Sequence, residues 1–231
     1  MVELIAEVSS NHGGDLGLAK EFIHRFAEAG ADWVKFQTTR VKHLRPDDPQ
    51  YAWFTRAELS DEAHFELKAE CEKAGTKFLT TVYHADDVPF VRSVTDTVKI
   101  GSGESDEASL LRAVQDAGFS RVLVSDGLVR QRTYYYAERL ACVTRYPAPH
   151  GCVPEAFDAF GVYQGWSDHC VGLDSCKLAI LRGATIIEKH VCLPNQARPV
   201  RSFEATIEEF AELRAFADED PTRFIGRWQC A

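Results

Sequence analysis

The amino-acid sequence predicts an α/β fold, a compact (β/α)8 TIM barrel with some shortened helices, formed by a single domain over residues 1–231. The first observation is that eight β-rich runs alternate with helical stretches or with gaps of helix length. Sequential βα units imply parallel strands with right-handed crossovers, and eight units favour closure into a barrel. The second observation is that no G-x-G-x-x-G sequence follows the first run, which disfavours an open doubly wound sheet.

The β-rich runs follow helix-ending glycines. The predicted strands cover residues 3–8, 33–37, 78–82, 97–100, 122–125, 140–144, 162–166 and 185–188. Gly30, Gly75, Gly118 and Gly183 lie a few residues before four of these runs, and each is expected to end a helix as a left-handed residue. Connections this short are typical of α/β units. The gaps after the fifth and sixth runs are short, so shortened or missing helices are expected there.

Apolar residues with helical spacing predict the helices before those glycines. They are Leu18, Phe22 and Phe26, then Ala63, Leu67 and Cys71, then Leu110, Leu111 and Val114, and finally Phe210, Leu213 and Ala217. Asp106 is the expected N-cap of the third of these helices. Thr206 and Glu209 have the spacing of a capping box and are expected to open the last helix.

Composition and charge exclude several classes of function. The net charge of −9 and the lack of a basic stripe argue against a nucleic-acid partner, although a locally basic pocket remains compatible with a small phosphorylated substrate. No apolar run approaches the roughly 20 residues of a membrane span. The first β-rich run begins at once, so no signal peptide is expected. Seven cysteines form no C-x-x-C pair, which favours free thiols and a cytoplasmic location.

Polar residues gather at the C-terminal ends of the predicted strands, where barrel enzymes carry their chemistry. In strand order they are Glu7 with Asn11 and His12; Lys35 and Gln37; Thr80 and Thr81; Lys99, Ser102 and Glu104; Ser125; Thr144, Arg145 and Tyr146; Ser167, Asp168 and His169; and Glu188, Lys189 and His190. Lysine and glutamate are rarely buried without a partner or a use, which indicates a functional site. A structural role for the lysines remains the alternative.

Two histidines are candidate metal ligands because of where they lie. His169 and His190 follow neighbouring strands, and each has a carboxylate within two residues, although either could be a structural histidine. The other six histidines have no such pairing, and most are expected on the surface or in loops. They are His12, His24, His43, His64, His84 and His150.

Seven short segments occur in a fixed order between about positions 3 and 215. They read IAEVSSNHGGDL, GADWVKFQT, FLTT, VKIGSGE, CVTRYPAP, GWSDH and GATIIEKH. Each is a modest signal, but together they resemble the N-acetylneuraminate (sialic acid) synthases and their pseudaminate and legionaminate relatives. The resemblance implies a transferase that condenses phosphoenolpyruvate with an aldehyde or aldose, releasing phosphate and an α-keto acid of the 3-deoxy-2-ulosonic type. Carbohydrate or specialised-metabolite biosynthesis is the expected setting.

The resemblance also implies roles for individual residues. Phosphoenolpyruvate would be bound by Lys35, Gln37, Thr81, Lys99, Ser102, Ser125, Thr144 and Ser167. The catalytic carboxylates would be Glu7, Glu104 and Glu188. The acceptor would contact Asn11, Tyr146, Asp168, Arg198 and Arg201. His169 and His190 would bind Mn²⁺ or Mg²⁺, which polarises the acceptor carbonyl.

The sequence departs from the family mainly where the acceptor would bind. Relatives carry a C-terminal antifreeze-like domain that this sequence, ending at Ala231, is expected to lack, so a homodimer would use barrel surfaces alone. Arg198-Pro-Val-Arg201 replaces a PGPD loop, and the loop over residues 38–60 is shorter. We therefore expect an acceptor other than N-acetylmannosamine, and the arginines favour an anionic one.

Two other functions stay open. A Schiff-base aldolase would use Lys35, Lys99 or Lys189 as its nucleophile. A catalytically inactive barrel could instead act as a binding subunit, because some helices are trimmed and acceptor residues are replaced.

Overall fold

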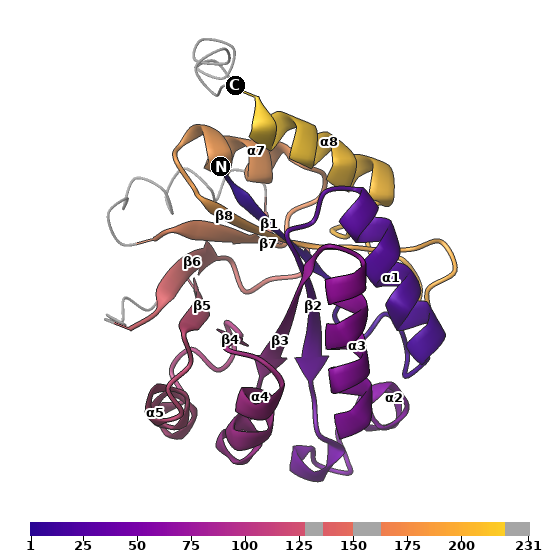
Figure 1. The fold of residues 1–231 in the computed structure, drawn as a ribbon, viewed down its shortest axis with the longest axis vertical. Helices are drawn as coiled ribbons and strands as arrows, with labels where there is room; N and C mark the ends of the chain where they lie inside the picture. The colour runs from indigo at the N-terminus through magenta and orange to yellow at the C-terminus, as the bar shows by residue number, and fades with distance from the viewer. Residues whose placement is uncertain (128–135, 150–162, 220–231) are drawn as a thin grey trace.

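The computed structural model describes residues 1–127, 136–149 and 163–219, and it confirms the predicted barrel. Eight parallel strands close in sequence order, with the last pairing to the first (Figure 1). They are β1 (Glu3–Glu7), β2 (Trp33–Thr38), β3 (Lys77–Val82), β4 (Thr97–Ile100), β5 (Arg121–Gly127), β6 (Glu138–Cys142), β7 (Gly165–Asp168) and β8 (Ile186–His190).

Helices surround the strands on the outside (Figure 1). They are α1 (Leu16–Glu28), α2 (Tyr51–Ala57), α3 (Asp61–Lys73), α4 (Val88–Val94), α5 (Ala108–Asp116), α7 (Asp174–Leu181) and α8 (Ile207–Asp218), with short 3-10 helices η1 (Val41–His43) and η2 (Ala85–Asp87). The four glycines expected to end helices all have positive φ angles, between 67° at Gly118 and 96° at Gly183. The shortened helices expected after β5 and β6 fall mainly on residues 128–135 and 150–162, outside the described part of the chain.

Helix starts follow local capping. The predicted capping box of α8 is confirmed, because Thr206 and Glu209 each accept from the other's backbone N–H. The prediction for α5 was wrong by one residue. Its N-cap is Glu107, which has extended backbone and accepts a hydrogen bond from the Ser109 N–H, so Asp106 lies just outside the helix.

The outer core lies between the barrel and its helices. Phe22 and Phe26 of α1 are fully buried, and the Phe26 ring packs edge-to-face on Phe210 of α8 at 5.4 Å between centroids. This contact joins α1 and α8, the helices that follow the neighbouring strands β1 and β8. Among the described residues, no helix is long and apolar enough to span a membrane.

A separate apolar layer fills the inside of the barrel. It consists of Ile5, Trp33, Leu79, Leu123, Leu140 and Ile186, from six different strands. Strand side chains alternate between faces, so the residue two positions further along each strand also points inward. Five of these six next residues are polar and the sixth is Cys142, and together they form the floor of the site described below.

β7 lies later in the sequence than predicted, at residues 165–168 rather than 162–166. Gly165 begins the strand because β7 and β8 approach closely there. A Cβ at this position would lie 2.3 Å from the carbonyl oxygen of Ile186. The shift places Ser167 and Asp168 within the strand itself, which decides the direction in which each side chain points.

Candidate active site

An inward-facing polar layer lies directly above the apolar layer of the barrel. Parallel pairing sets Glu7 beside Lys35 and Ser167 beside Glu188, at neighbouring strand ends. Twelve of the predicted site residues line one small cavity of about 50 Å³ at this level. They are Glu7, Lys35, Gln37, Thr81, Lys99, Ser102, Ser125, Tyr146, Ser167, His169, Glu188 and His190. The structure thus brings together most of the predicted set.

Lys35 lies between two buried carboxylates. Its Nζ is 3.0 Å from Glu7 Oε2 and 3.2 Å from Glu188 Oε1, and it donates a hydrogen bond of 3.0 Å to Thr81 Oγ1. Only 4% of the Lys35 side chain is exposed, so these interactions act in a medium of low dielectric constant. The ammonium group is therefore held rigidly in the cavity wall.

Lys99 forms the second buried cation of this layer. Its Nζ donates to Ser125 Oγ at 2.6 Å and to the Ile100 carbonyl at 2.9 Å, and it lies 3.7 Å from Glu188 Oε2. Ser167 donates to the other oxygen of Glu188 at 3.2 Å. Hydroxyl and ammonium groups thus converge on one space at the end of the barrel.

Burial and charge divide the roles of the two carboxylates. Burial raises the pKa of Glu7 to about 7, and the neighbouring carboxylate of Glu188 adds to this effect against the charge of Lys35. Burial acts in the same direction on Glu188, but the charges of Lys35 and Lys99 outweigh it and lower its pKa. Glu188 therefore stays ionised near neutral pH, whereas Glu7 titrates there. Gln37 donates to Glu7 Oε1 at 3.1 Å and holds it in place.

The two ammonium groups also differ. Burial lowers the pKa of Lys99 to about 8, with Lys35 acting in the same direction. For Lys35, the nearby charges of Glu188 and Glu7 outweigh burial and raise the pKa. Lys35 is therefore a permanent cation, and Lys99 is the lysine that loses its proton more readily.

His169 and His190 fit a divalent cation. Their ring centroids are 5.3 Å apart, and burial lowers the pKa of both, which favours the neutral, metal-binding imidazole. His169 Nδ1 donates to the Val143 carbonyl at 2.7 Å, which leaves Nε2 as the ligating nitrogen. His190 Nδ1 is buried without a hydrogen bond in the described part of the chain. The pair is not part of any three-residue cluster of metal-ligating side chains found among the described residues.

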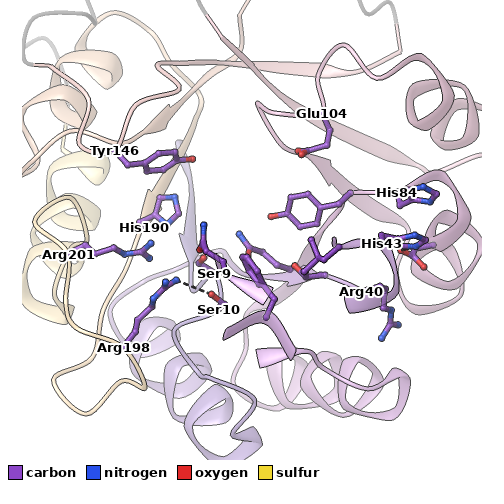
Figure 2. A pocket seen from close by; sticks show the side chains of 17 residues that line it. Ser9, Ser10, Arg40, His43, His84, Glu104, Tyr146, His190, Arg198 and Arg201 are labelled. Carbon is purple, nitrogen blue, oxygen red and sulfur yellow. Dashed lines mark hydrogen bonds and ion pairs between the residues drawn. The ribbon is translucent and has the colours of Figure 1, made fainter. Parts of the chain in front are cut away.

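A larger pocket of about 450 Å³ opens above the polar cavity, and Figure 2 shows its walls. The two spaces share Gln37, Tyr83, Tyr146 and His190 as lining residues. Tyr146 stacks on His169 at 3.9 Å between centroids. The cavity and the pocket therefore form one continuous site, narrow and charged below, wider above.

The upper pocket is lined by three arginines (Arg40, Arg198 and Arg201) and by the carboxyl groups of Asp87 and Glu104. Arg198 donates to Ser10 Oγ at 3.2 Å, shown as the dashed line in Figure 2, and its guanidinium lies 4.6 Å from the Trp53 ring centroid. It makes no ion pair with a carboxylate among the described residues, whereas Arg201 pairs with Glu204. Glu104 lies across the pocket from Arg198 and Arg201 in Figure 2, and burial raises its pKa.

Asp168 and Asn11, two of the predicted acceptor ligands, line neither the cavity nor the upper pocket. Asp168 follows Ser167 on β7, so it points to the opposite, outer face of the barrel. There it is 2.5 Å from Lys189 Nζ and accepts from Ser175 Oγ at 2.6 Å. Lys189 follows Glu188 on β8 and therefore also points to the outer face. It does not line the cavity, which argues against Lys189 as the Schiff-base lysine. Asp168 and Lys189 form a buried structural pair.

Asn11 and Thr144 also lie off the cavity walls. Asn11 is fully buried and donates to the Val191 carbonyl at 3.0 Å and to Glu204 Oε1 at 2.9 Å. It also accepts from Arg201 at 3.2 Å, so it braces the loop that carries this arginine. Thr144 is exposed beyond the end of β6 and lines neither space.

The prediction that most of the remaining histidines lie on the surface or in loops holds for His12, in a turn, and for the exposed His24 and His84, but not for His64 of α3. His12 and His64 are buried, and His64 is held between the Ser60 carbonyl at 2.8 Å and Thr38 Oγ1 at 3.0 Å. His24 is exposed beside Glu70. His150 lies outside the described residues. Tyr83 was missed, although strand alternation indicates it, because it lies two residues after the inward-facing Thr81.

Comparison with known proteins agrees with the fold and the sequence resemblance. A model described as the NeuB family matches residues 22–219. The chain is 31% identical to an N,N'-diacetyllegionaminic acid synthase of Legionella pneumophila over 81% of this chain and 63% of the relative. It is 29% identical to the synthase of the same name in Campylobacter jejuni, over 82% and 67%. The chain thus spans about two thirds of the length of these relatives.

A solved structure gives the same result for the fold. The N-acetylneuraminic acid (sialic acid) synthetase of Leptospira borgpetersenii superposes with a TM-score of 0.86, covering 100% of this chain and 87% of that one, at 24% identity. The barrel is therefore the one found in that synthetase. Because the family model covers most of the chain, this protein belongs to the NeuB family.

Proposed function

We propose that this protein condenses phosphoenolpyruvate with an aldehyde or aldose to give an α-keto acid of the 3-deoxy-2-ulosonic type and phosphate. The observation that carries this proposal is the buried layer of two ammonium groups and three hydroxyls around one small cavity. Its members are Lys35, Lys99, Thr81, Ser125 and Ser167. Such a set suits a small, highly charged anion. The synthase names of the relatives support the same reaction class.

In this reaction C3 of phosphoenolpyruvate forms a bond to the carbonyl carbon of the acceptor, and water adds at C2. The bond between C2 and the phosphate oxygen of this tetrahedral intermediate then breaks. Phosphate leaves, and a keto group remains at C2. Glu7 is the residue that we assign to take the proton from this water, because its pKa of about 7 lets it accept a proton near neutral pH. Lys35 and Lys99 hold the phosphate and carboxylate groups, and Gln37 holds Glu7 in position.

We assign a divalent metal, Mn²⁺ or Mg²⁺, to His169 and His190. When bound, it would polarise the carbonyl oxygen of the acceptor. The neutral imidazoles and the unpartnered Nδ1 of His190 support this assignment. The pair itself supplies two nitrogen ligands, and water and substrate oxygens would complete the coordination.

We place the acceptor in the upper pocket, with an anionic group near Arg198. This guanidinium lies on the Trp53 ring and has no carboxylate partner among the described residues, so it is available to an anion. Tyr146 and Arg201 would contact the rest of the acceptor. Five free, buried cysteines in the described part of the chain support a reducing, cytoplasmic setting.

The test is release of phosphate from phosphoenolpyruvate in the presence of Mn²⁺ and a panel of aldoses, phosphorylated aldoses and simple aldehydes. Release is expected only when phosphoenolpyruvate, metal and a suitable aldehyde are all present, and His190→Ala should abolish it. Thr144→Ala is the matched control and should retain full activity, because this side chain is exposed away from the cavity. Absence of release with every aldehyde would contradict the proposal.

A Schiff-base aldolase remains the second candidate because of Lys99. Burial lowers its pKa to about 8, which increases the fraction of nucleophilic amine. Borohydride treatment with a carbonyl substrate distinguishes the two reactions. A covalent adduct on Lys99 would favour the aldolase, whereas the condensation forms no imine.

A further inference from the structure

A second cluster of metal-ligating side chains lies on the wall of the upper pocket. His43 ends η1 after β2, His84 precedes η2 after β3, and Asp86 lies within η2. One ligand atom from each lies within 4.8 Å of the others, and no other group of three metal-ligating residues in the described part of the chain does so. Figure 2 shows His43 and His84 on the side of the pocket away from His190.

The side chains are already close to the geometry of a metal site. The two imidazole rings stack at 3.8 Å between centroids, and Asp86 Oδ2 lies 3.5 Å from His84 Nδ1. Two ligands that each lie about 2.1 Å from one Zn²⁺ are at most ~4.2 Å apart. His84 and Asp86 are exposed and His43 is partly buried, so small side-chain rotations are enough to bring all three ligands onto one ion.

Asp87 gives an independent indication that His43 is a metal ligand. Its carboxylate is 5% exposed, and its Oδ2 lies 3.1 Å from His43 Nε2. The two atoms are not in hydrogen-bond geometry, so both are buried without a hydrogen bond among the described residues. Lys42 Nζ, 3.0 Å away, satisfies only the other oxygen of Asp87. A His43 that ligates a metal through Nδ1 carries its proton on Nε2, which can then donate to this carboxylate and satisfy both atoms.

We propose that His43, His84 and Asp86 bind a divalent transition cation of the Zn²⁺ type, with Asp87 orienting His43. Two imidazoles and one carboxylate form a ligand set that such ions prefer, and it leaves a coordination position open. Carboxylates commonly orient ligating histidines from behind in this way. Because His43, His84 and Asp87 line the upper pocket, the site lies at its wall on the side away from His190.

The test is calorimetric titration of the untagged, metal-stripped full chain with ZnCl₂. The wild-type chain should bind two equivalents, one at each histidine pair. His84→Ala and His190→Ala should each bind one, and the double variant none. His24→Ala is the matched control and should still bind two, since His24 is an exposed histidine that contacts Glu70 on the outer helices.

Asp86→Asn provides a second variant that leaves the fold intact, because this side chain is 72% exposed. It should weaken one of the two equivalents at least about tenfold and leave the other unchanged. Wild-type stoichiometry and affinity in His84→Ala would overturn the proposal. Loss of one equivalent in His84→Ala without any loss in His190→Ala would instead support this site and contradict the metal assigned to His169 and His190.

Discussion

Replacing Lys35 by methionine tests the electrostatics of the site. Methionine retains most of the apolar stem but removes the ammonium group that lies 3.0 Å from Glu7 and 3.2 Å from Glu188. Lys99, 3.7 Å from Glu188, then remains as the nearest cation. Removing one partner of a buried ion pair costs about 3–5 kcal/mol because the other charge stays buried. We expect Lys35→Met to lose stability of this size at pH 8.

The same variant should be less destabilised at pH 5.5. The folded-state pKa of Glu7 is already raised to about 7, so the folded protein binds a proton more tightly than the unfolded chain does. The stability that comes from this tighter proton binding is fully present below the pKa of about 4.5 that Glu7 has in the unfolded chain. It is lost as the pH rises through the folded-state pKa of about 7. Without Lys35 the pKa rises further, so Glu7 is protonated at pH 5.5 and adds no unpaired charge there.

Urea unfolding followed by circular dichroism at the two pH values measures both effects. Lys20→Met is the matched control, because Lys20 pairs with Glu66 at the surface and should change the midpoint little. Wild-type stability of Lys35→Met at pH 8 would refute the reasoning about the buried pair. An equal loss at both pH values would refute the role of Glu7.

Three further perturbations separate chemistry from structure. Wild-type kcat/KM should rise as the pH increases through about 7, and Glu7→Gln should lower it by about 10²–10⁴-fold and abolish this rise with pH. The same rise with pH in Glu7→Gln would identify another base. Asp168→Asn should lower the free energy of unfolding in urea by about 3 kcal/mol, because it leaves Lys189 buried and unpaired, and it should leave the KM for the acceptor unchanged. A raised KM with normal stability would instead mean that Asp168 contacts the acceptor. Phe26→Ala should cost about 3–5 kcal/mol in the same assay because it opens a cavity against Phe210, and a loss below about 1 kcal/mol would contradict the packing described.

Most of the fold could be predicted because it depends on local signals. Glycines such as Gly30 and Gly183 end helices in the left-handed conformation, and β-rich runs follow each within a few residues. The polar layer was also predictable, because Lys35 lies two residues after the inward-facing Trp33 and shares its direction. The alternation that identifies Lys35 excludes Asp168, so the error at Asp168 came from reading strand ends without assigning each side chain to a face.

The remainder depends on contacts between distant parts of the chain. Glu7 and Glu188 come together only because β1 pairs with β8 across the closed barrel, and no local pattern gives their shared contact with Lys35. The pKa of Glu7 follows from that contact and from burial. His43 and His84 lie in loops after two different strands, where no periodicity sets the direction of a side chain, so their stacking could not be predicted.

The most direct test of the account is a crystal structure of the full chain soaked with phosphoenolpyruvate and Mn²⁺. We predict that the phosphate and carboxylate groups lie within hydrogen-bond distance of Lys35, Lys99 and Ser125, with the ion bound by His169 and His190. Phosphoenolpyruvate bound only in the upper pocket, with Lys35 still bridging its two glutamates and no ion at the histidine pair, would contradict the account.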